Sequence, residues 1–355
     1  ITARPRLETF DGEVELEVGN YNTRRAMGMV NVPLGETLAL RVAGALTQRD
    51  GYGYNLTTKQ DVDGRDLWST RVSLAWEPTD RLRADFVWER FEEDDNRLRT
   101  GKQLCHYDPG PETLPGVVGP IDPVMRGRLS MGCKPGSLYS KDAFGTPNGI
   151  SIPFIFVGMT LPSLGYTASP FIPEPVWGWD YNPAAQNVNF IQYGVDPYGG
   201  LQQSRDLRTI ESDLQPRYEA KADIFNLSVS FDLTDNLTLT SQTLYNEDRV
   251  WSFQDYNRFK TLPIWNDSSG LYSPYISAFD PSQWNDMSPL QPLTPGGIFC
   301  DPQIGCSDTI AGFEISSSES EQFSQEFRLE SSFDGPFNFT LGANYMNVEG
   351  LNDYY

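Results

Sequence analysis

Four short turn-forming segments separate strand-like stretches along this 355-residue chain, and they constrain its fold more than any other feature. Each is rich in Pro, Gly, Asp or Asn, which reverse a chain tightly, and each joins stretches in which apolar and polar residues alternate. A period of two is typical of strands with one apolar face. The turns lie at residues 32–37, 77–81, 233–237 and 333–337.

The opposite ends of these strands run into much longer connections. Residues from about 94 to 216 and from about 249 to 320 are rich in Pro, Gly and aromatic residues and show no sustained period. Loops of this length count against most compact folds. Short turns on one side and long loops on the other are typical of outer-membrane β-barrels.

We therefore predict an all-β fold, an antiparallel transmembrane β-barrel with short periplasmic turns and long extracellular loops. The apolar row that runs from Trp68 to Trp76, opposed by Ser69, Arg71 and Ser73, has tryptophan at both ends, as a lipid-facing strand should. The chain supplies about nine strands, whereas bacterial barrels use an even number and close on themselves. We expect it to form part of a larger barrel.

Composition excludes several classes of function. A net charge of -21 argues against nucleic-acid binding. His106 is the sole histidine, which disfavours Ser-His-Asp and metal-hydrolase chemistry. We predict that the protein is not an enzyme and has no metal site and no cofactor. No apolar run reaches the roughly 18 residues that a membrane helix needs.

Four cysteines fall within the two long connections. Cys105 and Cys133 lie in the first, and Cys300 and Cys306 lie in the second. Sequence alone allows three pairings. The economical choice joins the two cysteines of each connection, as expected in an oxidising compartment. A zinc site is the weaker reading, because the spacings match no zinc pattern.

Several segments resemble one protein family in both order and spacing. Together they are similar to the TonB-dependent outer-membrane receptors, from the end of the plug domain through the first barrel strands. The matching segments are residues 1–5, 19–25, 32–41, 49–52 with Asn55, 323–329 and 337–342.

The resemblance implies a tail of the plug domain at residues 1–8 and the N-terminal portion of the barrel at residues 9–355. It further implies a bacterial outer-membrane location and energised uptake of a bulky, scarce nutrient. A ferric siderophore is the default ligand, and an oligosaccharide or another organic ligand is the alternative. The implied partners are outer-membrane lipid and lipopolysaccharide, together with TonB, which acts through a plug and a box that this chain lacks. The resemblance leaves open whether a surface lipoprotein is also a partner.

Aromatic residues of the long connections are the candidate ligand-binding residues, because flat rings bind sugars, aromatic siderophores and apolar nutrients at low entropic cost. The alternative is that they form the loops' own small cores. These candidates are Trp177, Trp179, Tyr181, Trp251, Tyr256 and Trp284.

Charged residues on the polar side of the strands are candidates for contact with a plug inside the barrel, although simple solvation of the lumen would account for them equally well. They are Glu15, Glu17, Arg71, Glu326 and Arg328.

Two other functions remain open on the sequence. One is a non-transporting outer-membrane barrel used at the cell surface or for adhesion. The other is a secreted all-β carbohydrate-binding protein, in which apolar strand faces would meet each other in a sandwich.

Overall fold

The computed structural model describes residues 3–99, 101–152, 195–267, 269, 294–301 and 305–355. The chain divides into two units. The sheet unit comprises Ile1–Gly101, Leu214–Tyr256 and Phe313–Tyr355, and the loop unit comprises Lys102–Asp213 and Asn257–Gly312.

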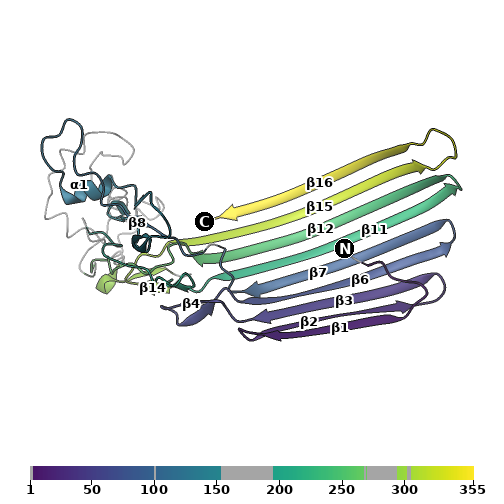
Figure 1. Cartoon of the computed structure of the whole chain (residues 1–355), viewed down its shortest axis with the longest axis horizontal. Coiled ribbons are helices and arrows are strands. Elements are labelled where there is room, and N and C mark those ends of the chain that lie inside the picture. Colours follow the sequence, from purple (N-terminus) through teal and green to yellow (C-terminus); the bar gives the residue numbers. More distant parts are fainter. Residues whose placement is uncertain (1–2, 100, 153–194, 268, 270–293, 302–304) are drawn as a thin grey trace, which may run out of the picture. The chain divides into compact units, whose positions relative to one another are not determined.

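The sheet unit is one antiparallel sheet of nine strands, in the order β1-β2-β3-β6-β7-β11-β12-β15-β16 (Figure 1). The predicted all-β, antiparallel fold is confirmed. Each of the nine strands pairs with the one that precedes or follows it among the nine in chain order. The strands are β1 (Asp11–Gly19), β2 (Thr23–Pro33), β3 (Leu38–Arg49), β6 (Arg65–Thr79), β7 (Leu82–Asp95), β11 (Arg217–Thr234), β12 (Leu237–Asp255), β15 (Phe313–Ser331) and β16 (Thr340–Tyr354).

The short connections β2–β3, β6–β7, β11–β12 and β15–β16 coincide with the four turn segments. The longer connections lie at the other ends of the strands, and one includes the small hairpin β4 (Gly53–Asn55) and β5 (Gln60–Val62). β12 and β15 extend further into the expected connection 249–320 than alternation indicated, since they pair from Leu237↔Ser331 through Asp255↔Phe313. The serine-rich residues 316–320 have no apolar face, so backbone pairing alone marks them as strand.

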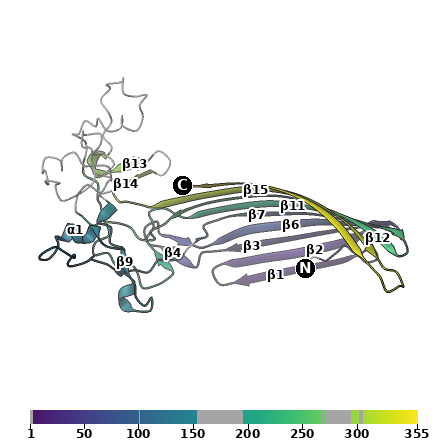
Figure 2. The same ribbon diagram turned by 90° about the horizontal axis from the view of Figure 1, so that it is seen from above.

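The register gives the sheet two chemically different faces. Residues directly opposite one another on paired strands point to the same face. Val42↔Val72, Val72↔Trp88 and Trp88↔Phe225 therefore share one face, and Arg41↔Ser73 and Ser73↔Val87 share the other. We call the first the apolar face and the second the polar face. The strands bend together, so the sheet is curved (Figure 2).

The segment before β1 lies on the polar face and is fixed there by hydrogen bonds. The fully buried Asn31 of β2 accepts a bond from the Arg6 amide (2.9 Å) and donates to the carbonyl oxygens of Arg6 (2.9 Å) and Thr9 (2.7 Å). Arg4 forms ion pairs with Glu77 (2.7 Å) and Asp85 (2.5 Å). Pro5 is buried between these contacts.

Within its described residues, the loop unit has little regular structure and contains two disulfides. Cys105–Cys133 and Cys300–Cys306 are bonded, which is the pairing favoured from the sequence. Its elements are β8 (His106–Tyr107), α1 (Pro123–Arg128), β9 (Cys133–Lys134), η1 (Lys141–Ala143), β10 (Thr209–Ile210), η7 (Pro295–Gly297), β13 (Phe299–Asp301) and β14 (Gly305–Ser307). Among the residues described, no helix has both the length and the apolar character needed to cross a bilayer.

Replacing Asn31 by Ala should loosen the segment before β1 without unfolding the sheet. The change leaves one amide and two carbonyl groups without their partner, at a cost of about 1–2 kcal/mol, because water can reach the exposed Arg6 and Thr9. Hydrogen exchange of residues 4–10 should then speed up roughly 5–30-fold. Asn347→Ala, on the exposed strand β16, is the control. Unchanged exchange in N31A would contradict the role given to Asn31.

Candidate functional site: two faces and a polar rim

The apolar face carries a continuous band of apolar side chains across all nine strands, which we call the apolar band. Near one edge of the sheet, Leu16 lies opposite Ala26, Ala26 opposite Leu46, and Leu46 opposite Trp68 on the paired strands. Near the other edge, Phe231 lies opposite Leu239, Leu239 opposite Leu329, and Leu329 opposite Leu341. In β11 the band runs from Phe225 to Leu233, about 27 Å along the strand at about 3.4 Å per residue. Outer-membrane barrels carry a band about 25 Å tall.

Large side chains of the apolar band are solvent-exposed in the isolated chain. Phe231 is 42% exposed, Phe327 50% and Trp76 46%. A contiguous apolar surface of this size is unusual on a soluble monomer and marks a surface that contacts lipid or protein.

Aromatic rings border the apolar band where the strands approach the long connections. Trp88, Phe225, Tyr245 and Phe323 are directly opposite one another on four consecutive strands. The Trp88 and Phe225 rings stack at 6.4 Å, and those of Phe225 and Tyr245 lie 6.2 Å apart. Such a row resembles the interfacial girdle of membrane barrels, whose rings have an apolar body and, in Trp and Tyr, a polar tip.

A charged row follows directly beyond the aromatic rings, again on the apolar face. Register aligns Arg90, Asp223, Glu247 and Glu321 across the same four strands. The indole nitrogen of Trp88 donates to the carboxylate of Asp223 at 3.0 Å. The face therefore changes from apolar to aromatic to charged within a few residues, as at a membrane–water boundary.

The polar face holds all five charged residues that were candidates for contact with a plug. Arg71 pairs with Glu89 on β7, and Glu17 pairs with Arg25 at 3.7 Å. Glu326 lies 3.9 Å from Arg328. Glu15 and Arg71 line the same shallow cavity of about 370 Å³. Contact with a plug remains a prediction.

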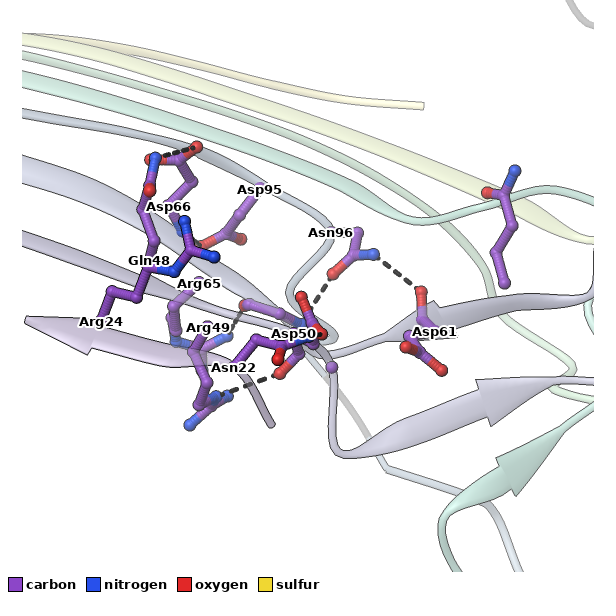
Figure 3. A pocket seen from close by; sticks show the side chains of 13 residues that line it. Asn22, Arg24, Gln48, Arg49, Asp50, Asp61, Arg65, Asp66, Asp95 and Asn96 are labelled. Carbon is purple, nitrogen blue, oxygen red and sulfur yellow. Dashed lines mark hydrogen bonds between the residues drawn. The ribbon is translucent and has the colours of Figure 1, made fainter. Parts of the chain in front are cut away.

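Figure 3 shows a second cavity, of about 610 Å³, at the loop end of β2, β3, β6 and β7, which we call the rim pocket. Sequence reasoning missed it, because its residues come from strand ends and turns that have no periodic pattern. The lining comprises three guanidinium groups, four carboxylates, four amides and two glycines: Arg24, Arg49, Arg65, Asp50, Asp61, Asp66, Asp95, Asn22, Gln48, Gln60, Asn96, Gly51 and Gly64.

Two glycines allow the backbone to pack closely beneath the rim pocket. A Cβ atom on Gly51 would lie 2.1 Å from the carbonyl oxygen of Val62, which a side chain cannot accommodate. Gly64 donates its amide to Asn96 at 2.7 Å, and a Cβ there would approach the same Asn96 oxygen to 2.8 Å. A larger residue at position 51 would push β5 away from the end of β3, and one at position 64 would displace the Asn96 side chain.

The predicted ligand-binding aromatics are only partly placed. Trp177, Trp179, Tyr181 and Trp284 lie outside the described residues. Trp251 was expected in a loop, but it lies within β12, opposite Glu219 and Ser317, with its ring stacked on Phe253 at 6.4 Å. The expectation was wrong because the strand continues past the point where alternation ends. Tyr256 directly follows β12 and is exposed. Ligand binding by these residues stays a prediction.

Polar contacts organise the described part of the loop unit. Hydrogen bonds from the amides of Met131 and Gly110 hold the pKa of Asp108 below its usual range. Burial lowers the pKa of Lys102, whose ammonium donates to the carbonyl oxygens of Ser204 and Asp206. No group of three or more His, Cys, Asp or Glu side chains in the described ranges is arranged to hold a metal ion.

Comparison with known proteins gives matches among solved structures. No family model and no curated protein matches the chain. The siderophore receptor PiuA from Acinetobacter baumannii has a TM-score of 0.49 at 12% identity, over 99% of this chain and 32% of the receptor. The ferric-catecholate import receptor Fiu from E. coli K12 has a TM-score of 0.47 at 11% identity, over 98% of this chain and 32% of that receptor. The ferripyoverdine receptor of Pseudomonas aeruginosa has a TM-score of 0.47 at 9% identity, over 99% of this chain and 29% of that receptor. The chain thus spans about a third of each.

Arginine at position 229, in the middle of the apolar band on β11, should destabilise the protein in lipid by about 2–4 kcal/mol. Ser228→Arg is the matched control, because its side chain points to the polar face, opposite Asp85 and Gln242. Chemical unfolding from phospholipid vesicles, followed by tryptophan fluorescence, measures both variants. Equal costs for V229R and S228R would show that the apolar band does not face lipid.

Proposed function

We propose that this chain forms part of the wall of an outer-membrane β-barrel that acts as a TonB-dependent receptor for energised nutrient uptake. The apolar band carries the proposal. It crosses every strand of the sheet on one face, is bordered by aromatic rings, and has ion pairs on its reverse side.

A bilayer suits this surface better than water does. Each buried square ångström of apolar surface gains about 25 cal/mol, so side chains such as Phe231 and Phe327 contribute most when lipid covers them. A secreted β-sandwich would bury the same side chains against a second sheet. Within the described residues, the other strands form sheets of two or three short strands.

The polar face suits the water-filled interior of a barrel. Arg71–Glu89 and Arg83–Asp232 cross adjacent strands on this face, where water screens the charges. The segment at residues 4–9 crosses it as well. This path supports the reading of residues 1–8 as the end of a plug domain, with the chain passing from the interior of the barrel into its wall.

The ligand class rests on the sequence resemblance and on the composition of the loops. A ferric siderophore is the default, and an oligosaccharide or another organic nutrient is the alternative. TonB, outer-membrane lipid and lipopolysaccharide are the partners that this function requires. The described part of the loop unit supplies a disulfide-bonded scaffold suited to an extracellular setting.

Cysteine labelling should place the long connections and the short turns of the sheet unit on opposite sides of the membrane. Val118 of the loop unit is fully exposed, and Asp235 lies in the β11–β12 turn. A membrane-impermeant maleimide on intact cells should label V118C and not D235C, because the turns face the periplasm. D235C should react once the outer membrane is permeabilised. Labelling of D235C on intact cells would contradict this orientation.

Uptake should depend on the energy-coupling system. Cells that express the protein containing this chain should accumulate radiolabelled iron from a panel of ferric siderophores, and loss of TonB should abolish that accumulation. A second panel of labelled oligosaccharides tests the alternative ligand class. If neither panel is taken up while V118C remains surface-labelled, the result would contradict uptake of both ligand classes and favour a non-transporting surface barrel.

A further inference from the structure

Among the described residues, two charged side chains of the rim pocket, Arg24 and Asp61, differ from its other charged groups in their lack of polar contacts. Over the described ranges of the chain, neither the Arg24 guanidinium nor the Asp61 carboxylate makes a hydrogen bond or ion pair. Both residues are exposed. The backbone of Asp61 is nevertheless fixed, because its carbonyl oxygen accepts bonds from Asn96 (2.8 Å) and Gln215 (3.0 Å).

Other charged groups of the rim pocket are already bound to the protein. Arg49 donates to the carbonyl oxygen of Asp63 at 2.7 Å and lies 3.5 Å from the centre of the Tyr52 ring. Arg65 donates to the Asp63 carboxylate at 3.1 Å and to the Gly64 carbonyl at 2.6 Å. In the part of the chain that the structure describes, the carboxylates of Asp50, Asp66 and Asp95 have no ion pair, but they accept hydrogen bonds from Asn22, Gln48 and two backbone amides. Arg24 and Asp61 are therefore the charged groups of the pocket that remain to bind a ligand through both hydrogen bonds and charge.

The two open charges lie at opposite ends of the pocket. In Figure 3, Arg24 and Asp61 stand at the two ends of the labelled group, with Arg49, Arg65 and Asp50 between them. Arg24 projects from β2 and Asp61 from the β4–β5 hairpin. A ligand that satisfies both must be extended, with a negative group at one end and a positive group at the other.

We propose that the rim pocket binds a short peptide with free termini, its carboxylate on Arg24 and its ammonium on Asp61. A guanidinium fork matches a carboxylate bidentately, and charge-assisted bonds are about twice as strong as neutral ones. Asp61 can accept from an ammonium in the same way. The side-chain amide of Gln60, adjacent to Asp61, offers a donor and an acceptor to a peptide bond.

Ligands of a single sign fit the rim pocket less well. Its three guanidinium groups and four carboxylates create no strong net field for a phosphate or a divalent cation. A neutral sugar would form hydrogen bonds but leave both Arg24 and Asp61 without a counter-charge. The volume of about 610 Å³ lies within the range of small-ligand sites.

The test is calorimetric titration of the detergent-purified protein at low ionic strength with four alanine tetrapeptides. One has free termini, one is amidated, one is acetylated and one carries both blocks. The free peptide should bind, and each block should weaken binding about fivefold, the upper end for an exposed ion pair. The double block should weaken it further.

Charge-removing variants assign each terminus to its residue. Arg24→Gln should weaken the free peptide about fivefold and make binding insensitive to amidation, whereas Asp61→Asn should remove the sensitivity to acetylation. Arg25→Gln is the matched control for Arg24, because Arg25 is the next residue, lies on the polar face and pairs with Glu17. Asp80→Asn, in the β6–β7 turn, is the control for Asp61.

The proposal would be overturned if no tetrapeptide bound, or if the free and doubly blocked peptides bound with equal affinity. It would also be overturned if R24Q lowered the affinity for all four peptides by the same factor. An effect of R25Q as large as that of R24Q would likewise overturn it. The titration involves no transport, so its failure would leave the uptake function standing, and failure of uptake would leave the peptide site standing.

Discussion

Continuous backbone pairing between antiparallel strands is the constraint on which the rest of the structure depends. From Gly19↔Thr23 at one edge to Ser316↔Tyr354 at the other, each strand is hydrogen-bonded to its chain neighbour. Because side chains alternate between faces, this one register decides which residues meet lipid and which meet water. A shift by one residue on β11 would move Phe225 and Leu227 to the polar face and Asn226 and Ser228 into the apolar band.

The fold was largely predictable because alternation and turn chemistry are local signals. Strands such as β6 and β7 carry both, and their bounds follow from the sequence. The far ends of β12 and β15 do not, since Ser316–Ser320 shows no apolar face and is strand by pairing with its neighbour. Trp251 was misplaced for the same reason.

The candidate site residues also differ in whether local sequence signals could predict them. The faces of Glu15, Arg71 and Glu326 follow from the parity of their positions, so sequence could assign them to one side of the sheet. The rim pocket could not be found in this way, because Arg24, Gln48 and Asp61 are far apart in sequence and meet through pairing of β2, β3 and the β4–β5 hairpin. Gly51 and Gly64 were the local signals, since each marks a close backbone approach.

The attachment of residues 4–9 to the polar face has a mechanical consequence. A tension applied to the chain ahead of Arg4 is taken first by the Arg4 ion pairs and then by the Asn31 hydrogen bonds. Those contacts end on β2, β6 and β7, and Arg6 of the same segment also pairs with Asp11 of β1. The load is therefore shared among four strands of the sheet, and β1 does not bear it alone.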